Sequence, residues 1–172
     1  MRTLVLTCFA LLYACTLHAA PIDDAREMLR AGEPERALRH LDAHIKANPR
    51  DTEARFLKGV VLSEQGDPAG AIEVFRGLTR DYPELPEPYN NLAVLYAARG
   101  DYRAARDALD MAVRVKPDYA TAYENLGDVH VLLAQEAYDK ALAIDGANPR
   151  ARAKLKLARE LAAYSPRPAS IP

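Results

Sequence analysis

The chain carries two histidines, His40 and His44, at a spacing that could bind a metal ion. On a helix, residues four apart lie on the same face, so both imidazoles could hold one zinc ion. However, Leu41 follows His40, whereas the helical metalloprotease motif has a glutamate at that place. His44 also stands at a position that packing side chains occupy in the neighbouring segments. We therefore favour packing roles over a metal site, and predict no bound metal.

No set of side chains typical of an enzyme is present in the sequence. There is no glycine-rich phosphate loop and no nucleophile elbow, and the carboxylates are spread along the chain without an obvious pair. Both cysteines, Cys8 and Cys15, lie close to the N-terminus, so the rest of the chain has no thiol nucleophile and no disulfide. We predict a non-enzymatic protein without a cofactor.

The N-terminal segment has the pattern of a secretory signal peptide, which we place at residues 1–20. An apolar run covers Thr3–Leu17, too short for a comfortable membrane span, and Ala19 and Ala20 follow it. A second interpretation stays open, because the sequence Leu12–Cys15 resembles a bacterial lipoprotein box, with Cys15 as the lipidated residue. Either reading predicts an exported protein in the periplasm, with possible attachment to the outer membrane.

Two amphipathic segments joined by a turn make up Pro86–Tyr119. Apolar residues recur at helical spacing in both segments, and the turn at 99–101 separates them. Thr52–Leu85 repeats this pattern at a constant offset, so that Gly66 matches Gly100. No run of alternating β-branched residues indicates a strand. The sequence therefore predicts an all-α protein built from repeated helix pairs.

This pattern resembles the tetratricopeptide repeat, a helix–turn–helix unit of about 34 residues. The resemblance implies a right-handed α-solenoid, with repeats at about 21–51, 52–85 and 86–119, a shortened unit at 120–148 and a capping helix at 149–164. Small residues would let the two helices of a unit approach closely, at Gly59, Ala93 and Gly127. Larger residues would fill the core and the gaps between units, namely Phe75, Tyr89, Leu92, Tyr96, Leu109, Tyr123 and Leu126, with His130 in an aromatic position.

The fourth unit lacks the turn that the others have. No glycine or proline lies between Gly127 and Gly146, and the apolar stripe continues without a change of phase. We expect its two helices to be fused into one long helix. The alternative is a cramped turn near Leu133 and Ala134.

Two asparagines, Asn91 and Asn125, recur at the same phase of successive repeats. Each follows a packing tyrosine by two positions and precedes a packing leucine, so both are expected to point away from the core and to be exposed. The resemblance implies that amides at this place bind the backbone of a peptide in a concave groove, since an amide both donates and accepts hydrogen bonds. Asn90, Glu124 and Asp128 are expected on the same face. The other interpretation is an ordinary solvated surface.

One feature of the chaperone-binding members of the family is absent. The cationic residue that clamps a C-terminal carboxylate in those members is replaced here by Asn90 and Glu124. The resemblance therefore does not extend to the binding of chaperone tails.

The charges are unevenly distributed along the chain. All 24 acidic residues and all but one of the 23 basic residues follow the N-terminal segment, a balance that argues against nucleic acid as a partner. The expected capping helix is basic, and we favour a solvated cap whose charges balance those of the acidic repeats. The alternative is that this helix docks on an anionic membrane or an acidic partner. The proline-rich segment 165–172 is expected to be disordered.

We therefore expect an adaptor of the periplasm or cell envelope that binds a segment of another envelope protein in its groove. The alternative is an assembly factor anchored by a lipid on Cys15, for example for a pilus or a secretion system. An enzyme or a metal protein is the least favoured class.

Overall fold

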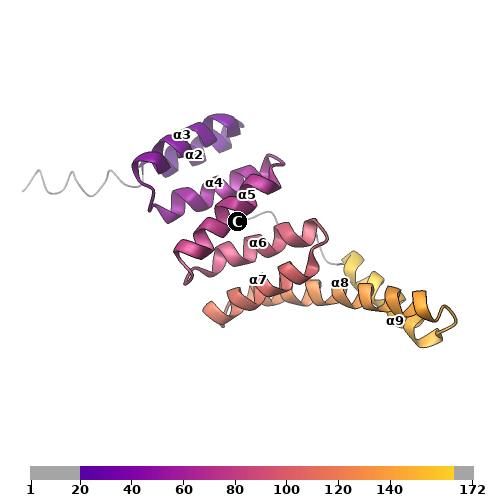
Figure 1. Ribbon diagram of the computed structural model, residues 1–172. Coiled ribbons are helices and arrows are strands. Elements are labelled where there is room, and N and C mark those ends of the chain that lie inside the picture. Colours follow the sequence, from indigo (N-terminus) through magenta and orange to yellow (C-terminus); the bar gives the residue numbers. More distant parts are fainter. Residues whose placement is uncertain (1–19, 165–172) are drawn as a thin grey trace, which may run out of the picture. The chain divides into compact units, whose positions relative to one another are not determined.

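The computed structural model describes residues 20–164, which form eight helices and no strand (Figure 1). The all-α prediction is confirmed. Residues 1–19 of the predicted signal peptide (1–20), with the candidate lipidation site Cys15, and the tail at 165–172 lie outside the described residues. The helices are α2 (Ala20–Arg30), α3 (Pro34–Ala47), α4 (Thr52–Glu64), α5 (Pro68–Asp81), α6 (Pro86–Ala98), α7 (Tyr102–Val115), α8 (Ala120–Ile144) and α9 (Pro149–Tyr164).

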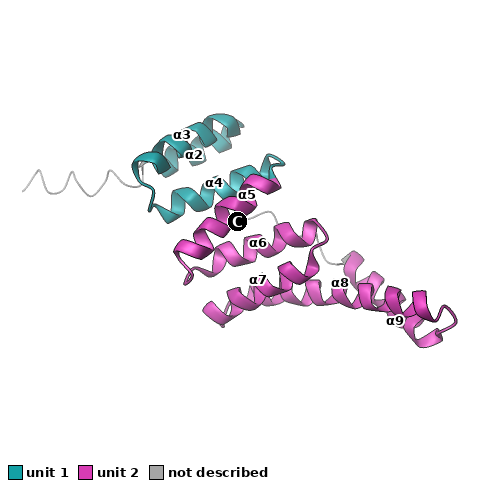
Figure 2. Ribbon diagram, viewed as in Figure 1, with its two compact units in different colours: residues 1–67 teal, residues 68–172 magenta. Residues whose placement is uncertain are grey.

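The chain divides into two compact units, with the boundary between residues 67 and 68 (Figure 2). The first contains α2–α4 and the second α5–α9. Within each unit, helices that follow one another in the chain pack together, and in the second unit α6 also contacts α8. This contact between alternate helices brings the first helices of two successive predicted repeats side by side.

A glycine in the left-handed conformation ends the first helix of three predicted repeats. Gly32, Gly66 and Gly100 have φ angles of 76°, 75° and 78°. At the third of these turns, the Gly100 amide donates to the Ala97 carbonyl (3.0 Å) and the Asp101 amide to that of Tyr96 (2.9 Å). These two bonds form a Schellman motif, in which glycine adopts a conformation that other residues avoid.

The same series explains the long helix α8. These glycines recur at one fixed spacing along the chain, and the next position in the series is occupied by Ala134. The left-handed conformation costs a residue with a Cβ about 1–2 kcal/mol. The chain continues instead as one helix of 25 residues. The predicted fusion is confirmed, and the alternative of a turn at Leu133 and Ala134 is wrong.

Small and apolar side chains fill the core of each unit. In the first unit, the buried residues from its three helices form one cluster: Ile22, Ala25, Ala37, Leu41, Ala54 and Val61. In the second unit Phe75, Leu92, Ala93 and Leu109 are buried, as the repeat pattern predicts. Tyr89, Tyr96 and Leu126 are only partly buried.

Three packing predictions for α8 are wrong. Tyr123 is 49% exposed, and Gly127 and His130 are exposed as well. A Cβ built on Gly127 would meet no atom within 4 Å, so this glycine does not serve a close helix contact. The cause is the fusion of the helices. In an ordinary unit the second helix would fold back over this part of the first, whereas here the chain continues straight.

The helix that does fold back, α9, covers a later part of α8. It has 16 residues against the 25 of α8, and the Gln135 side chain donates a hydrogen bond to the Ala158 carbonyl (3.2 Å). Lys154 lies over the ring of Tyr138, 5.7 Å from its centre. These contacts place α9 along the C-terminal half of α8 and leave the first turns of α8 without it.

Candidate functional site

The candidate site is formed by matching strips of α6 and α8. Residues three and four apart share a face of a helix, which groups Glu87, Asn90, Asn91 and Val94 on α6. At the corresponding positions one repeat later, the strip on α8 contains Glu124, Asn125 and Asp128. We call these seven residues the α6–α8 face.

A hydrogen bond between side chains joins the two strips. The Asn125 Nδ2 group donates to Asn90 Oδ1 at 2.8 Å. Asn90 is buried and Asn125 is partly exposed. The bond uses one of the two amide hydrogens of Asn125 and leaves its Oδ1 as an acceptor, so this amide keeps the capacity to bind a further polar group.

The prediction that Asn91 is exposed is wrong, since Asn91 is only 4% exposed. The reason lies in the neighbours of each helix. The helix α6 contacts α5, α7 and α8, whereas α9 covers only the later part of α8 and leaves its first turns uncovered on that side. Equal phase in two repeats therefore does not give equal surroundings. Of the two predicted amides, Asn125 is the accessible one.

The other predicted residues of this face differ in their accessibility. Glu124 is exposed, while Asp128 and Glu87 are partly buried. Nearby, burial raises the pKa of the Tyr119 hydroxyl, and the negative charge of Glu87 raises it further. The Lys116 ammonium lies over the same ring, 5.3 Å from its centre. The α6–α8 face thus combines amides with carboxylates, and sequence reasoning did not include Glu87 in it.

The two histidines that could have bound a metal have other surroundings. His44 Nε2 lies 2.7 Å from Asp51 Oδ2, and Asp51 Oδ1 accepts the Ala54 amide at 3.0 Å, which caps α4. Burial acts to raise the pKa of the Asp51 carboxyl, but the Ala54 amide and His44 outweigh it and lower that pKa. The His40 Nε2 atom is buried without a hydrogen-bond partner. Among residues 20–164, no three His, Cys, Asp or Glu side chains gather as metal ligands would.

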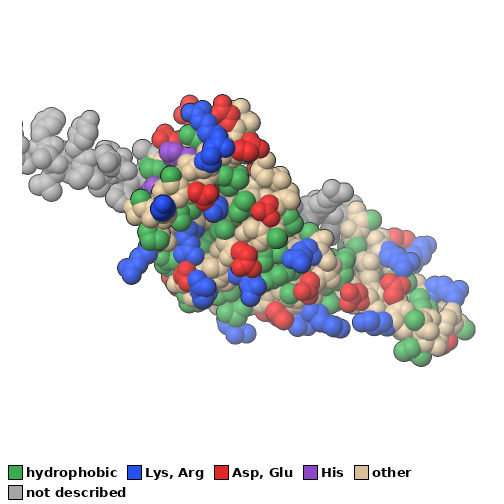
Figure 3. Space-filling view, turned by 45° about the horizontal axis from the view of Figure 1, so that its top comes forward, with side chains coloured by type: hydrophobic (Ala, Val, Ile, Leu, Met, Phe, Trp, Pro, Cys, Tyr) green, Lys and Arg blue, Asp and Glu red, His purple; other side chains and the backbone are tan. Residues whose placement is uncertain are grey.

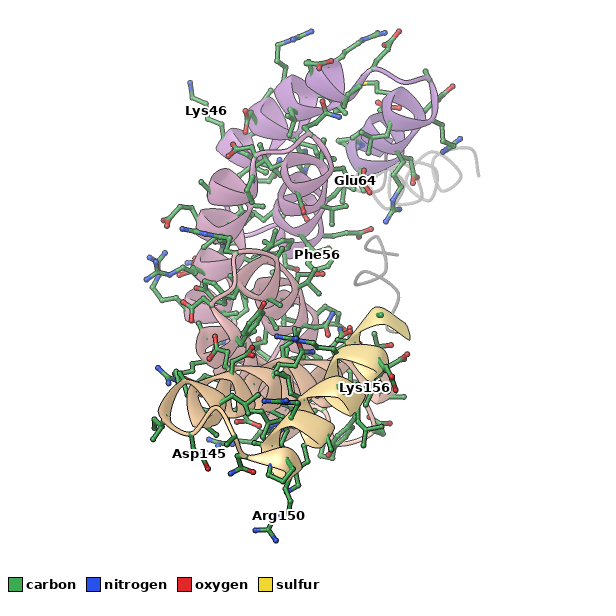
Figure 4. The ribbon with its side chains drawn as sticks, turned by 90° about the vertical axis from the view of Figure 1, so that its right-hand side faces the viewer. Lys46, Phe56, Glu64, Asp145, Arg150 and Lys156 are labelled. Atoms are coloured by element: carbon green, nitrogen blue, oxygen red, sulfur yellow. The ribbon has the colours of Figure 1, made fainter. Side chains whose placement is uncertain are left out.

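Acidic side chains pair with only some of the basic side chains of α9. Arg159 pairs with Asp139 of α8 at 3.0 Å, and Lys156 lies 3.8 Å from Glu160 of its own helix. Arg150, in the first turn, projects away from the helix (Figure 4). No helix within 20–164 is long and apolar enough to cross a membrane.

Comparison with known proteins identifies the fold. Two tetratricopeptide repeat profiles match residues 23–86 and 62–127. A crystal structure of MamA superposes with a TM-score of 0.61 and 28% sequence identity, covering 79% of this chain and 82% of that one. A thermophilic tetratricopeptide repeat protein of Thermus thermophilus superposes with a TM-score of 0.60 at 24% identity, covering 83% and 81% of the two chains, and supports the fold alone.

Relatives among characterised proteins are larger. The wheat (Triticum aestivum) Hsp70–Hsp90 organizing protein is 36% identical over 84 residues, which are 46% of this chain and 14% of that protein. The chloroplastic protein PYG7 of Arabidopsis thaliana, which contains a tetratricopeptide repeat domain, is 29% identical over 139 residues, or 74% and 45% of the two chains. The chain spans between 7% and 45% of the length of the curated relatives it matches. The matched repeats and the shared helical fold show that the chain belongs to the tetratricopeptide repeat family and forms an α-solenoid of the kind that serves protein interaction.

Proposed function

We propose that this protein is a non-catalytic adaptor that binds an extended segment of a partner protein on the α6–α8 face. The observation that carries the proposal is the Asn125–Asn90 hydrogen bond of 2.8 Å, which connects the first helices of two successive repeats. The side-chain amide of Asn125 is partly exposed. Its second N–H can donate to a peptide backbone, and its Oδ1 can accept from one.

The dimensions of the face suit an extended segment. Packed helices lie about 8–10 Å apart, and an extended chain advances about 3.3 Å per residue. A bound segment would therefore contact α6 and α8 with residues roughly three positions apart. The relative whose name describes it as organizing Hsp70 and Hsp90 also acts on other proteins, which agrees with an adaptor role.

Site-specific crosslinking in cells tests this function. A photoreactive amino acid replaces Glu124, which is exposed on the face, and in a matched control it replaces Asp110, which is exposed on α7. We expect a discrete protein adduct from position 124 and none from position 110. In addition, Asn125→Ala should reduce the yield of the adduct, because a hydrogen-bonding amide is lost. Equal labelling from both positions would count against the α6–α8 face as the binding site.

We further propose that the protein acts in the bacterial periplasm or cell envelope. Support comes from the sequence before Ala20, whose apolar run is typical of an export signal. The second candidate, a lipid-anchored assembly factor, is favoured by the Leu12–Cys15 motif. Mass spectrometry of the mature N-terminus separates the two, since a diacylglyceryl group on Cys15 and a plain N-terminus near Pro21 differ in mass. An intact Met1 would contradict both.

A further inference from the structure

We propose that the α6–α8 face selects a positively charged partner segment, one that carries lysine or arginine side chains. The inference rests on the proposed binding function and specifies the chemistry of its partner. It concerns the second unit alone, because every residue involved belongs to α6, α8 or the turn before α8.

The first argument is the charge of the two helices. No lysine or arginine occurs in α6 or within residues 120–139 of α8, while the face carries the carboxylates of Glu87, Glu124 and Asp128. The helix between them differs, since α7 contains Arg103, Arg106 and Arg114. On the face of the molecule that Figure 3 shows, acidic and basic side chains are interspersed. The excess of negative charge is thus a local property of the two helices that form the face.

The second argument concerns Glu87, Tyr119 and Lys116, which lie together at one end of the face. Burial raises the pKa of the Tyr119 hydroxyl, and the negative charge of the Glu87 carboxylate raises it further. Beside it, the Lys116 ammonium rests on the Tyr119 ring, so a cation is already accommodated at this end. This end of the face therefore combines a carboxylate with an aromatic ring that already holds a cation.

The third argument concerns the competing ligand, a free C-terminal carboxylate. On this face it would approach three carboxylates, and neither α6 nor residues 120–139 of α8 contain a lysine or arginine to pair with it. Like charges across an interface oppose binding, whereas opposite charges speed association and strengthen hydrogen bonds. A basic internal segment therefore fits better than an acidic tail. Its backbone would use the amide of Asn125, and its side chains would use Glu87 and Glu124.

Selection from an unbiased library of short displayed peptides tests the inference on the purified protein. We expect enriched peptides to be rich in lysine and arginine, and to bind equally well as synthetic peptides with a C-terminal amide. Affinity should fall as salt is raised, because the Debye length shrinks from about 8 Å at 0.15 M to about 3 Å at 1 M. The double variant Glu87→Gln, Glu124→Gln should bind the enriched peptides about tenfold more weakly.

The control variant Asp107→Asn, Asp110→Asn removes the same amount of charge from α7 and should bind as the unmodified protein does. Enriched peptides that are neutral or acidic, yet depend on Asn125, would overturn the charge inference and leave the adaptor function intact. If no recovered peptide depends on Asn125 for its binding, both the charge inference and the proposed binding function are overturned. If the α7 control loses as much affinity as the Glu87→Gln, Glu124→Gln variant, the charge inference is also overturned. The loss would then come from the net charge of the protein and not from the face.

Discussion

At the scale of single residues, Leu92 illustrates how the repeat core is held. Leu92 lies on α6, a helix that contacts three others, and is only 5% exposed. We predict that Leu92→Ala lowers the free energy of unfolding by about 2–5 kcal/mol, because it leaves a cavity between packed helices. Urea unfolding measures the change. Leu161→Ala is the matched control, since Leu161 is 54% exposed, and a surface change usually costs within about 0.5 kcal/mol. Similar losses in both variants would contradict the predicted packing.

Asp51 connects stability to pH in the first unit. Its carboxylate caps α4 and contacts His44, and its pKa is lowered from the ordinary value of 3.8. A carboxyl with a lowered pKa in the folded state stabilises the fold above its unfolded pKa, and this contribution is lost as the pH falls through the folded pKa. We predict that Asp51→Ala costs about 1–2 kcal/mol at pH 7, the usual value of a helix cap, and less below pH 3.8.

Unfolding curves of the Asp51 variant at neutral and acidic pH check this prediction. Asp24→Ala serves as the control, because Asp24 is an exposed carboxylate in the same unit. A cost that stays constant down to the most acidic pH would show that the carboxylate charge has no part in the effect.

Single residues were predicted well where a local pattern determines their place. Leu92 as a core residue follows from its place in the repeat pattern, and its burial is confirmed. Asn91 is different, because its exposure depends on how many helices surround α6. A repeat pattern assigns the same phase to Asn91 and Asn125, but it contains no information about neighbours from other parts of the chain.

At the scale of elements, the first turns of α8 retain a glycine that packing no longer requires. Gly127 lies within the helix, is exposed, and would meet no atom with an added Cβ. We predict that Gly127→Ala stabilises the protein by about 0.5–1 kcal/mol, because alanine loses less conformational entropy in a helix. Gly100→Ala should have the opposite effect, since Gly100 has a φ angle of 78°. Thermal unfolding compares them, and a destabilising Gly127→Ala would mean that another helix does approach there.

The continuity of α8 can be tested at its middle. Proline at position 135 removes a backbone hydrogen bond and clashes with the preceding turn, so Gln135→Pro should cost about 3 kcal/mol or more. Gln135→Ala is the control, because it removes only the side-chain bond to the Ala158 carbonyl. Circular dichroism and urea unfolding give the comparison. A proline variant as stable as the alanine variant would mean that the helix is interrupted at this point.

The helices themselves were predictable because turn-forming residues in the sequence mark where most of them end. The glycines at 32, 66 and 100 mark three turns, and alanine at 134 marks the missing one. The consequences of the fusion were not predicted. The apolar residues of α8 continue the family pattern, so Tyr123 looks like a core residue in the sequence. Its exposure follows only from where α9 lies.

At the scale of the whole molecule, α6 and the first part of α8 differ in charge from the helix α7 between them. All charged side chains of α6 and of residues 120–139 of α8 are carboxylates, whereas α7 carries three arginines beside Asp107 and Asp110. The fold alone would allow many partners, because a stack of helix pairs can present almost any side chains. What narrows the choice of partner here is the segregation of charge on that stack.

The same stack predicts a gradient of local stability. In a solenoid each element is held mainly by its nearest neighbours, so an end element has fewer contacts to lose when it opens. The helix α9 packs on α8 and leaves Leu157 64% and Leu161 54% exposed, whereas α6 contacts α5, α7 and α8. We predict that backbone amides of α9 exchange with deuterated water faster than those of α6, by at least about tenfold, since each step of about 1.4 kcal/mol in opening free energy changes the rate tenfold. Hydrogen exchange with mass spectrometry on peptides from 149–164 and 86–98 measures the difference. Equal protection would show that α9 opens only with the entire unit, which would require contacts beyond those with α8.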